Sequence, residues 1–155
     1  MKGAGCGPQP EAAARVEVLL ASRCEDDHGS LREIFRHSNW KLYEASNCIE
    51  ALALLYQFHI PVVICDCSLP EGGWRTLLPV VEAFPGRPRL IVFSRLADEQ
   101  LWGEVLNLGG YDVLSTPFDA GEVFRVSYLA WHSARNEARR MAAASQTTRP
   151  ARAAG

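Results

Sequence analysis

The sequence predicts an α/β fold, in which a parallel β-sheet lies between two layers of helices. Five short apolar segments recur along the chain, and most of them are rich in Val, Ile or Leu. Each is followed by a stretch whose apolar residues recur every three or four positions, the spacing of an amphipathic helix. Five rounds of strand then helix imply parallel strands joined by right-handed crossovers, with helices on both faces of the sheet.

The first two strand–helix units occupy the N-terminal part of the domain. Residues Val16–Ala21 form a strand candidate, and Asp26–Ser38 has apolar residues at helical spacing. Residues Lys41–Ala45 alternate in polarity like a short strand. The helix after them is expected to run from Ser46 or Asn47 to Tyr56, because Asn47 is a good N-cap and a glutamate follows it at capping-box distance.

The next two units follow the same pattern. Pro61–Cys65 is a short run with two Val and an Ile, and Arg89–Phe93 is largely apolar. Both predict buried strands. Trp74–Phe84 and Asp98–Leu108 have helical spacing, although Pro79 is unfavourable in a helix interior and predicts a kink. The fifth strand centres on Val113–Leu114.

The last helix is expected to begin near Asp119, which has Glu122 at capping-box spacing, and to end near Met141. We expect residues 1–15 to be disordered, residues 16–135 to form one domain, and residues 136–155 to hold the helix end and a disordered basic tail. No stretch is apolar enough to span a membrane, and the first residues lack the apolar core of a secretory signal, so we expect a cytoplasmic protein.

Charge divides the chain into an acidic body and a basic end. Residues 16–132 carry nine basic and 16 acidic side chains, a net charge of −7, whereas residues 133–155 carry five Arg and one Glu, a net charge of +4. An acidic body argues against a nucleic-acid-binding domain. The five cysteines lack paired spacing, which argues against a disulfide framework and favours unreactive, buried thiols over zinc ligands.

Asp66 is the most informative residue, because it stands at the carboxyl end of a predicted central strand. Open parallel sheets bind ligands and carry out chemistry at that edge. The local sequence leaves two interpretations open, an aspartate that caps its own turn and a phosphoryl acceptor. The other strand ends predicted at this edge are Ser22-Arg23, Ser94-Arg95 and Ser115-Thr116-Pro117.

Three segments, in order, resemble response-regulator receiver domains with the flavodoxin-like (CheY-like) fold. Asp66-x-x-Leu69-Pro70 with a Gly pair is similar to the family's phosphoacceptor loop, residues 43–52 to its second strand and helix, and residues 109–118 to its last strand. The resemblance implies a three-layer sandwich with strand order 2-1-3-4-5. It also implies that Asp66 accepts a phosphoryl group, that Ser94 is the switch hydroxyl, and that Pro117 follows a cis peptide bond.

The chain departs from the family at several positions. The acidic pair that holds Mg²⁺ in the family is replaced by Ser22 and Arg23, while Asp26 and Asp27 come about four residues too late and fall in the first helix. Thr116 stands at the position of the phosphate-binding lysine, and Val113 at that of the switch aromatic. The sequence therefore offers Mg²⁺ only Asp66 and a backbone carbonyl, unless Asp26 or Glu25 moves in.

Arg23 has two interpretations. Its guanidinium could pair permanently with Asp66, which would block the metal and weaken the nucleophile, and we expect this one. Alternatively Arg23, with Arg95, could replace metal and lysine and stabilise a phosphorylated Asp66.

The predicted function is a stand-alone, atypical response-regulator receiver in two-component or phosphorelay signalling, not an enzyme. The alternative is a phosphorylation-independent pseudo-receiver that acts by binding proteins, and a third class is a cofactor-binding domain of similar fold. Expected partners are a sensor histidine kinase or another signalling protein. Because the last helix is apolar on more than one face, we also expect a homodimer through the last two helices and the fifth strand.

Overall fold

The computed structural model describes the backbone of residues 15–154 and the side chains up to residue 144. Its centre is a sheet of five parallel strands in the spatial order β3-β2-β4-β5-β6. The strands are β2 (Glu17–Ala21), β3 (Lys41–Ala45), β4 (Val62–Asp66), β5 (Arg89–Ser94) and β6 (Asp112–Ser115). Counted along the chain, this is the order 2-1-3-4-5, which confirms the predicted fold class. The expected disorder of residues 1–14 lies outside the described residues.

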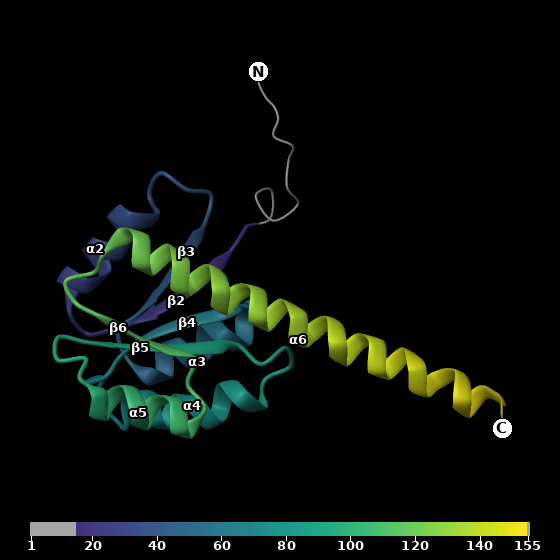
Figure 1. Cartoon of the computed structure of the whole chain (residues 1–155). Coiled ribbons are helices and arrows are strands. Elements are labelled where there is room, and N and C mark those ends of the chain that lie inside the picture. The colour runs from purple at the N-terminus through teal and green to yellow at the C-terminus, as the bar shows by residue number, and fades with distance from the viewer. Residues whose placement is uncertain (1–14, 155) are drawn as a thin grey trace, which may run out of the picture.

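Five helices connect and cover the strands (Figure 1). They are α2 (Glu25–Phe35), α3 (Cys48–Gln57), α4 (Gly73–Ala83), α5 (Glu99–Leu108) and α6 (Ala120–Ala154). Helices α2 and α6 pack on one face of the sheet, and α3, α4 and α5 on the other. Each face has its own apolar core, as expected for a sheet buried on both sides.

Local sequence explains where the helices begin. The Asn47 side chain accepts a hydrogen bond from the Glu50 amide at 2.8 Å, and the Glu50 carboxylate accepts one from the Ser46 amide at 2.8 Å. Asp98 caps α5 and Asp119 caps α6 in the same way. These bonds satisfy amide groups that have no partner inside a helix.

The turn before α4 requires glycine. Gly72 has a φ of +88°, in the left-handed region, and a Cβ atom there would clash with the Thr76 side chain. Pro79 lies inside α4, which continues to Ala83. The turn places the loop after Asp66 at the carboxyl edge of the sheet.

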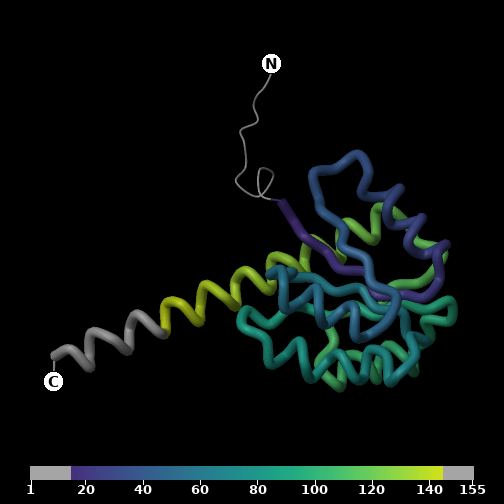
Figure 2. Tube along the Cα trace, turned by 180° about the vertical axis from the view of Figure 1, so that it is seen from behind, coloured from purple at the N-terminus to yellow at the C-terminus, as the bar shows by residue number. Residues whose placement is uncertain are grey.

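Helix α6 is longer than the sequence pattern predicts. It begins at Ala120 and continues to Ala154, past the end expected near Met141. Before residue 145 it already extends beyond the sheet (Figures 1 and 2). Alanine favours helix strongly, so Ala142–Ala144 continues the helix where we expected a frayed tail. Within residues 15–154, no helix combines the length and apolar character needed to cross a membrane.

Candidate functional site

Strand register brings the predicted site residues to one edge of the sheet. Ala21 pairs with Cys65, so Ser22 lies level with Asp66. Asp66 pairs with Phe93, so Ser94 lies one residue beyond that level. Ser94 in turn pairs with Ser115, which precedes Thr116. The four strand ends expected from the sequence therefore meet where parallel sheets place functional groups.

Asp66 is half-buried, and its two carboxylate oxygens have different surroundings. Oδ1 accepts hydrogen bonds from the Ser68 amide and the Ser68 hydroxyl, both at 2.9 Å. Oδ2 has only a long contact of 3.4 Å to the Ser22 hydroxyl. One oxygen thus fixes the turn, and the other faces the cavity with its bonding capacity largely unused, so capping and acceptor roles are compatible.

Asp27 joins Asp66 at the site, although we expected it to lie away from the site on the first helix. It does belong to the first turn of α2, and its Oδ2 accepts a hydrogen bond from the Ser22 hydroxyl at 2.8 Å. The Ser22 side chain is fully buried, and its oxygen also accepts a bond from the Cys24 amide at 3.0 Å. Ser22 therefore stands between two carboxylates from different elements.

Glu25 and Asp26, the two acidic residues considered from the sequence as further ligands, do not lie beside Asp66. Glu25 is exposed and pairs with Arg32 at 2.9 Å. Asp26 lines a smaller neighbouring cavity together with Asp27, Arg95 and Thr116. Of the three acidic residues that open α2, Asp27 is the one beside Asp66. Asp27 reaches Ser22 because of its position in the first turn of α2. The order of acidic residues in the sequence does not show which of them points toward Asp66.

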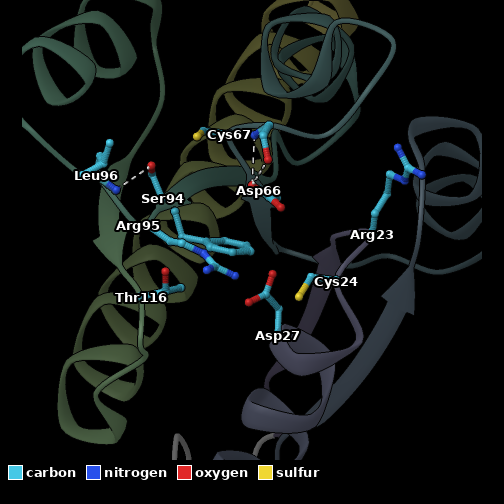
Figure 3. Close-up of a pocket in the computed structure, with 11 residues that line it drawn as sticks. Arg23, Cys24, Asp27, Asp66, Cys67, Ser94, Arg95, Leu96 and Thr116 are labelled. Atoms are coloured by element: carbon cyan, nitrogen blue, oxygen red, sulfur yellow. Dashed lines mark hydrogen bonds between the residues drawn. The ribbon is translucent and has the colours of Figure 1, made fainter.

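A cavity of about 540 Å³ opens at this edge (Figure 3). Its walls come from the β2–α2 loop, the β4–α4 loop, the end of β5 and the start of the loop after β6. It is lined by Arg23, Cys24, Asp27, Asp66, Cys67, Ser68, Phe93, Ser94, Arg95, Leu96 and Thr116. Two carboxylates and two arginines give the cavity charged side chains of both signs.

Ser94 and Thr116 both line the cavity, as the resemblance implies. The Ser94 hydroxyl accepts a hydrogen bond from the Leu96 amide at 3.0 Å, and in Figure 3 it points toward Leu96 and away from Asp66. The Thr116–Pro117 peptide bond is cis, as predicted. Val113, at the position of the family's switch aromatic, is buried in the core between the sheet and helices α3, α4 and α5.

The expected ion pair between Arg23 and Asp66 is not formed. Arg23 is exposed, and Figure 3 shows its side chain extending away from Asp66. No ion pair or hydrogen bond joins the two side chains in the described structure. The β2–α2 turn directs Arg23 outward, while Ser22, the residue before it, points in.

Arg95 lies inside the cavity. In Figure 3 its guanidinium end lies between Thr116 and the Asp27 carboxylate. It lines both the main cavity and the neighbouring one. The sequence placed Arg95 at a strand end, but the direction of a long side chain depends on the turn that carries it.

The oxygen donors present fit Mg²⁺, which proteins usually hold through one or two carboxylates together with water and phosphate oxygens. Asp66 and Asp27 are the residues that would hold it, and a bound Mg²⁺ would neutralise charge on a transferring phosphoryl group. Among the described residues, there is no cluster of three or more His, Cys, Asp or Glu side chains that could hold a metal ion by itself, so Mg²⁺ at Asp66 and Asp27 would also need water or phosphate oxygens. The site therefore offers fewer protein ligands than a dedicated metal cage.

The four cysteines that the structure describes, Cys24, Cys48, Cys65 and Cys67, form no disulfide bonds. Burial raises the pKa of the Cys48 and Cys65 thiols, which favours their protonated form. Cys24 and Cys67 are only half-buried and line the cavity.

A second polar network holds the β2–α2 loop, which carries Ser22. The buried His28 ring contacts the Ser22 carbonyl oxygen at 2.8 Å and the Glu44 carboxylate at 2.9 Å. Arg32 also donates to Glu44, at 2.9 to 3.1 Å. The Arg32 hydrogen bond, and to a smaller extent His28, lowers the pKa of Glu44. This network ties β3 and α2 to the loop that carries Ser22.

Large apolar side chains remain exposed on α5 and α6. Trp102 is 50% exposed, and Leu106, Leu108, Tyr128 and Leu129 are between 37% and 52% exposed. Other apolar residues of α6, including Val123, Val126 and Ala130, are buried against the sheet. The last helix is apolar on more than one face, as the sequence indicates, because some of its apolar residues lie in the core and others on the surface.

The sequence matches no family model and no curated protein. Its structure resembles solved receiver domains. The signal receiver domain of an HD domain-containing protein from Pseudomonas fluorescens Pf-5 has a TM-score of 0.71 and 26% identity, over 79% of this chain and 99% of that one.

Two further structures show the same fold at lower identity. The receiver domain of the Francisella response regulator 1452 has a TM-score of 0.68 and 21% identity, over 77% of this chain and 98% of that one. The chemotaxis response regulator CheY4 of Vibrio cholerae has a TM-score of 0.68 and 14% identity, over 76% of this chain and 99% of that one. The likeness covers most of the chain.

Proposed function

We propose that this chain, a domain with the response-regulator receiver (CheY-like) fold, is a signalling receiver that accepts a phosphoryl group on Asp66. The proposal rests on one observation. Asp66 presents a carboxylate oxygen with a single long hydrogen-bond contact to an open, charged cavity at the carboxyl end of a central strand. A nucleophile needs an available lone pair and access for its donor, and Oδ2 of Asp66 has both.

Ser94 supports the proposal as the residue that responds to phosphorylation. Its hydroxyl lines the same cavity but is held by the Leu96 amide. A phosphoryl group on Asp66 would supply strong acceptor oxygens for that hydroxyl. Release of the Leu96 amide would let the β5–α5 loop rearrange. This rearrangement would transmit the effect of phosphorylation from the cavity to α5.

The signalling role implies protein partners, and we propose a sensor histidine kinase or another phosphodonor protein as the source of the phosphoryl group. We also propose a homodimer through α5, β6 and α6, supported by the exposed apolar residues of both helices. A cytoplasmic setting, a lack of enzymatic activity and work as a stand-alone receiver remain predictions. So does the division into residues 1–15, 16–135 and 136–155, with α6 crossing the last boundary.

The alternative is a pseudo-receiver that acts by binding alone. The missing acidic pair and Thr116 at the lysine position favour it. The open Asp66 oxygen and the outward Arg23 favour phosphorylation instead, because the salt bridge expected to lock Asp66 is not formed. A cofactor-binding domain is the third class, and an absorbing chromophore in the purified protein would reveal it.

The test is the intact mass of the wild type after incubation with acetyl phosphate, with and without Mg²⁺. We expect a phosphoryl adduct on the wild type and none on Asp66→Asn. Asp98→Asn is the matched control, because Asp98 is an exposed helix cap outside the cavity, and it should be modified like the wild type. A wild type that stays unmodified with acetyl phosphate and with phosphorylated histidine kinases would support the binding-only alternative.

A further inference from the structure

The cavity lacks a cation at the position where Thr116 stands, yet a phosphoryl group on Asp66 needs one. Transfer of a phosphoryl group builds negative charge on its oxygens, and proteins stabilise it with Arg, Lys or metal ions placed beforehand. Asp66 and Asp27 add two further negative charges to the same cavity. A receiver without a local cation would therefore place three anionic groups together with nothing to balance them.

Two arginines line the cavity, and only one of them faces the carboxylates. Arg23 extends away from Asp66, whereas the guanidinium of Arg95 lies between Thr116 and Asp27 (Figure 3). Arg95 thus occupies the space beside the threonine that stands at the family's lysine position. The side chain reaches it from the end of β5 and not from the end of β6.

Arg95 is also uncommitted. Among the described residues it has no ion pair within 4 Å and no side-chain hydrogen bond, although two carboxylates line the same cavity. Asp27 and Asp66 accept their hydrogen bonds from serine hydroxyls and a backbone amide instead. The charges of opposite sign are therefore separated across the cavity, which leaves room for an anionic group between them.

The backbone around Arg95 is linked to the proposed switch. Arg95 lies between Ser94 and Leu96, whose hydroxyl and amide hydrogen-bond to each other at 3.0 Å. A turn of this kind fixes the backbone from which the Arg95 side chain starts. Release of Ser94 toward the phosphoryl group would move Arg95 with it.

We infer that Arg95 is the phosphoryl-binding cation of this site and replaces the missing lysine. The inference rests on the proposed function, because the phosphoryl group it binds is the one on Asp66. A guanidinium can donate two parallel hydrogen bonds to phosphoryl oxygens, and it stays charged at all physiological pH values. The Asp66 Oδ2 forms a bond to phosphorus while the donor's bond to phosphorus breaks, P–O in acetyl phosphate or P–N in a phosphohistidine. The acetate or the imidazole leaves with the bonding electron pair, and Arg95 contacts the phosphoryl oxygens.

The experiment compares rates of adduct formation with acetyl phosphate for Arg95→Ala, Arg95→Lys and Arg23→Ala. Arg23→Ala is the matched control, since Arg23 is also an exposed arginine that lines the same cavity. We expect Arg95→Ala to slow the reaction about 100-fold, the usual effect of removing one transition-state donor, and Arg23→Ala to have little effect. Arg95→Lys should retain part of the rate.

A rescue variant separates binding of the phosphoryl group from a structural role. Adding Thr116→Lys to Arg95→Ala returns a cation to the site from the β6 side, and we expect it to restore most of the lost rate. A purely structural Arg95 would not be rescued. If the wild type forms the adduct and Arg95→Ala and Arg23→Ala form it at equal rates, the inference is overturned and the proposed function stays intact.

If the wild type forms no adduct with acetyl phosphate, beryllium fluoride still tests the role of Arg95. It imitates a phosphoryl group on a carboxylate without any transfer step, and its binding is seen by ¹⁹F NMR. Binding by the wild type but not by Arg95→Ala would support Arg95 as the cation although acetyl phosphate phosphorylation has failed. No binding by the wild type, or equal binding by both proteins, would overturn the inference.

Discussion

Asp27, from the first turn of α2, and Asp66, at the end of β4, both accept from the hydroxyl of Ser22, at 2.8 Å and 3.4 Å. A single hydroxyl has one proton to donate, so the shorter contact to Asp27 takes it and leaves Asp66 Oδ2 more available. Two carboxylates beside one hydroxyl form an acidic site, although Ser22 and Arg23 stand at the positions of the family's acidic pair. This relationship makes Asp66 a reasonable acceptor despite the substitutions at Ser22 and Arg23.

Asp27 is expected to be the second carboxylate ligand of Mg²⁺. Asp27→Asn should weaken Mg²⁺ binding at least about tenfold, because half of the protein's carboxylate ligands would lose their charge. The readout is an NMR titration of the Cys67 and Ser68 amides with Mg²⁺. Asp26→Asn is the control, since Asp26 does not line the cavity that holds Asp66. Equal Mg²⁺ affinities for the two variants would remove Asp27 from the site.

Ser22 should contribute to stability as well as to the site. Ser22→Ala removes a fully buried hydroxyl that donates to Asp27 and accepts from the Cys24 amide. We expect the free energy of unfolding to fall by about 1 to 3 kcal/mol, the usual cost of leaving buried polar groups without partners.

Urea denaturation measures the loss from Ser22→Ala, and Ser115→Ala, at an exposed strand end, is the control. Unchanged stability for Ser22→Ala would show that water replaces the hydroxyl at no cost. The two carboxylates would then not depend on Ser22 for their positions.

Glu44 gives the fold a pH dependence. Its pKa is lowered mainly by the hydrogen bond from Arg32, and also by His28, against the opposing effect of burial. A carboxylate with a depressed pKa in the folded state stabilises the protein above its ordinary pKa. That contribution is lost as pH falls through the depressed value.

The variant Glu44→Gln should therefore lower the free energy of unfolding by about 1 kcal/mol near pH 7, a modest figure because the ion pair is partly exposed. The difference from the wild type should shrink below about pH 4, the ordinary range of glutamate. Urea denaturation across this pH range is the measurement. Glu33→Gln, which breaks an exposed pair with Arg36, should show almost no effect. A loss for Glu44→Gln that is the same at every pH would contradict the assignment.

Trp102 is expected to lie in the homodimer interface. Its side chain is 50% exposed on α5, and buried aromatic residues dominate the energy of many interfaces. Trp102→Ala should weaken self-association about tenfold or more, as loss of an interface anchor usually does. Sedimentation velocity over a concentration series measures it, with Ile49→Ala on α3, a residue 71% exposed, as the control. A wild type that is monomeric at every concentration would rule out the dimer.

The fold could be predicted from the sequence because strand and helix patterns alternate without interruption. The position of Asp66 followed from the same pattern, since a residue that ends a central parallel strand lies at the functional edge. The capping rules predicted the helix starts at Asn47 and Asp119, because capping is a local interaction.

Side-chain direction could not be predicted in the same way. Arg23 and Arg95 are both arginines after strand ends, yet one points out and the other into the cavity. Asp27 belongs to the helix that the sequence predicts, and only the rotation of α2 brings it to Ser22. These directions depend on the packing of loops and helices against the sheet, which no short sequence pattern contains.

The most direct test of the account is the location of the phosphoryl group. Borohydride reduces an aspartyl phosphate to homoserine, so reduction after acetyl phosphate treatment, followed by peptide mass spectrometry, identifies the modified residue. We predict homoserine at Asp66 in the wild type and in Asp27→Asn treated to completion. Homoserine at another aspartate, or at none while a histidine kinase also fails to modify Asp66, would contradict the assignment of Asp66 as the acceptor.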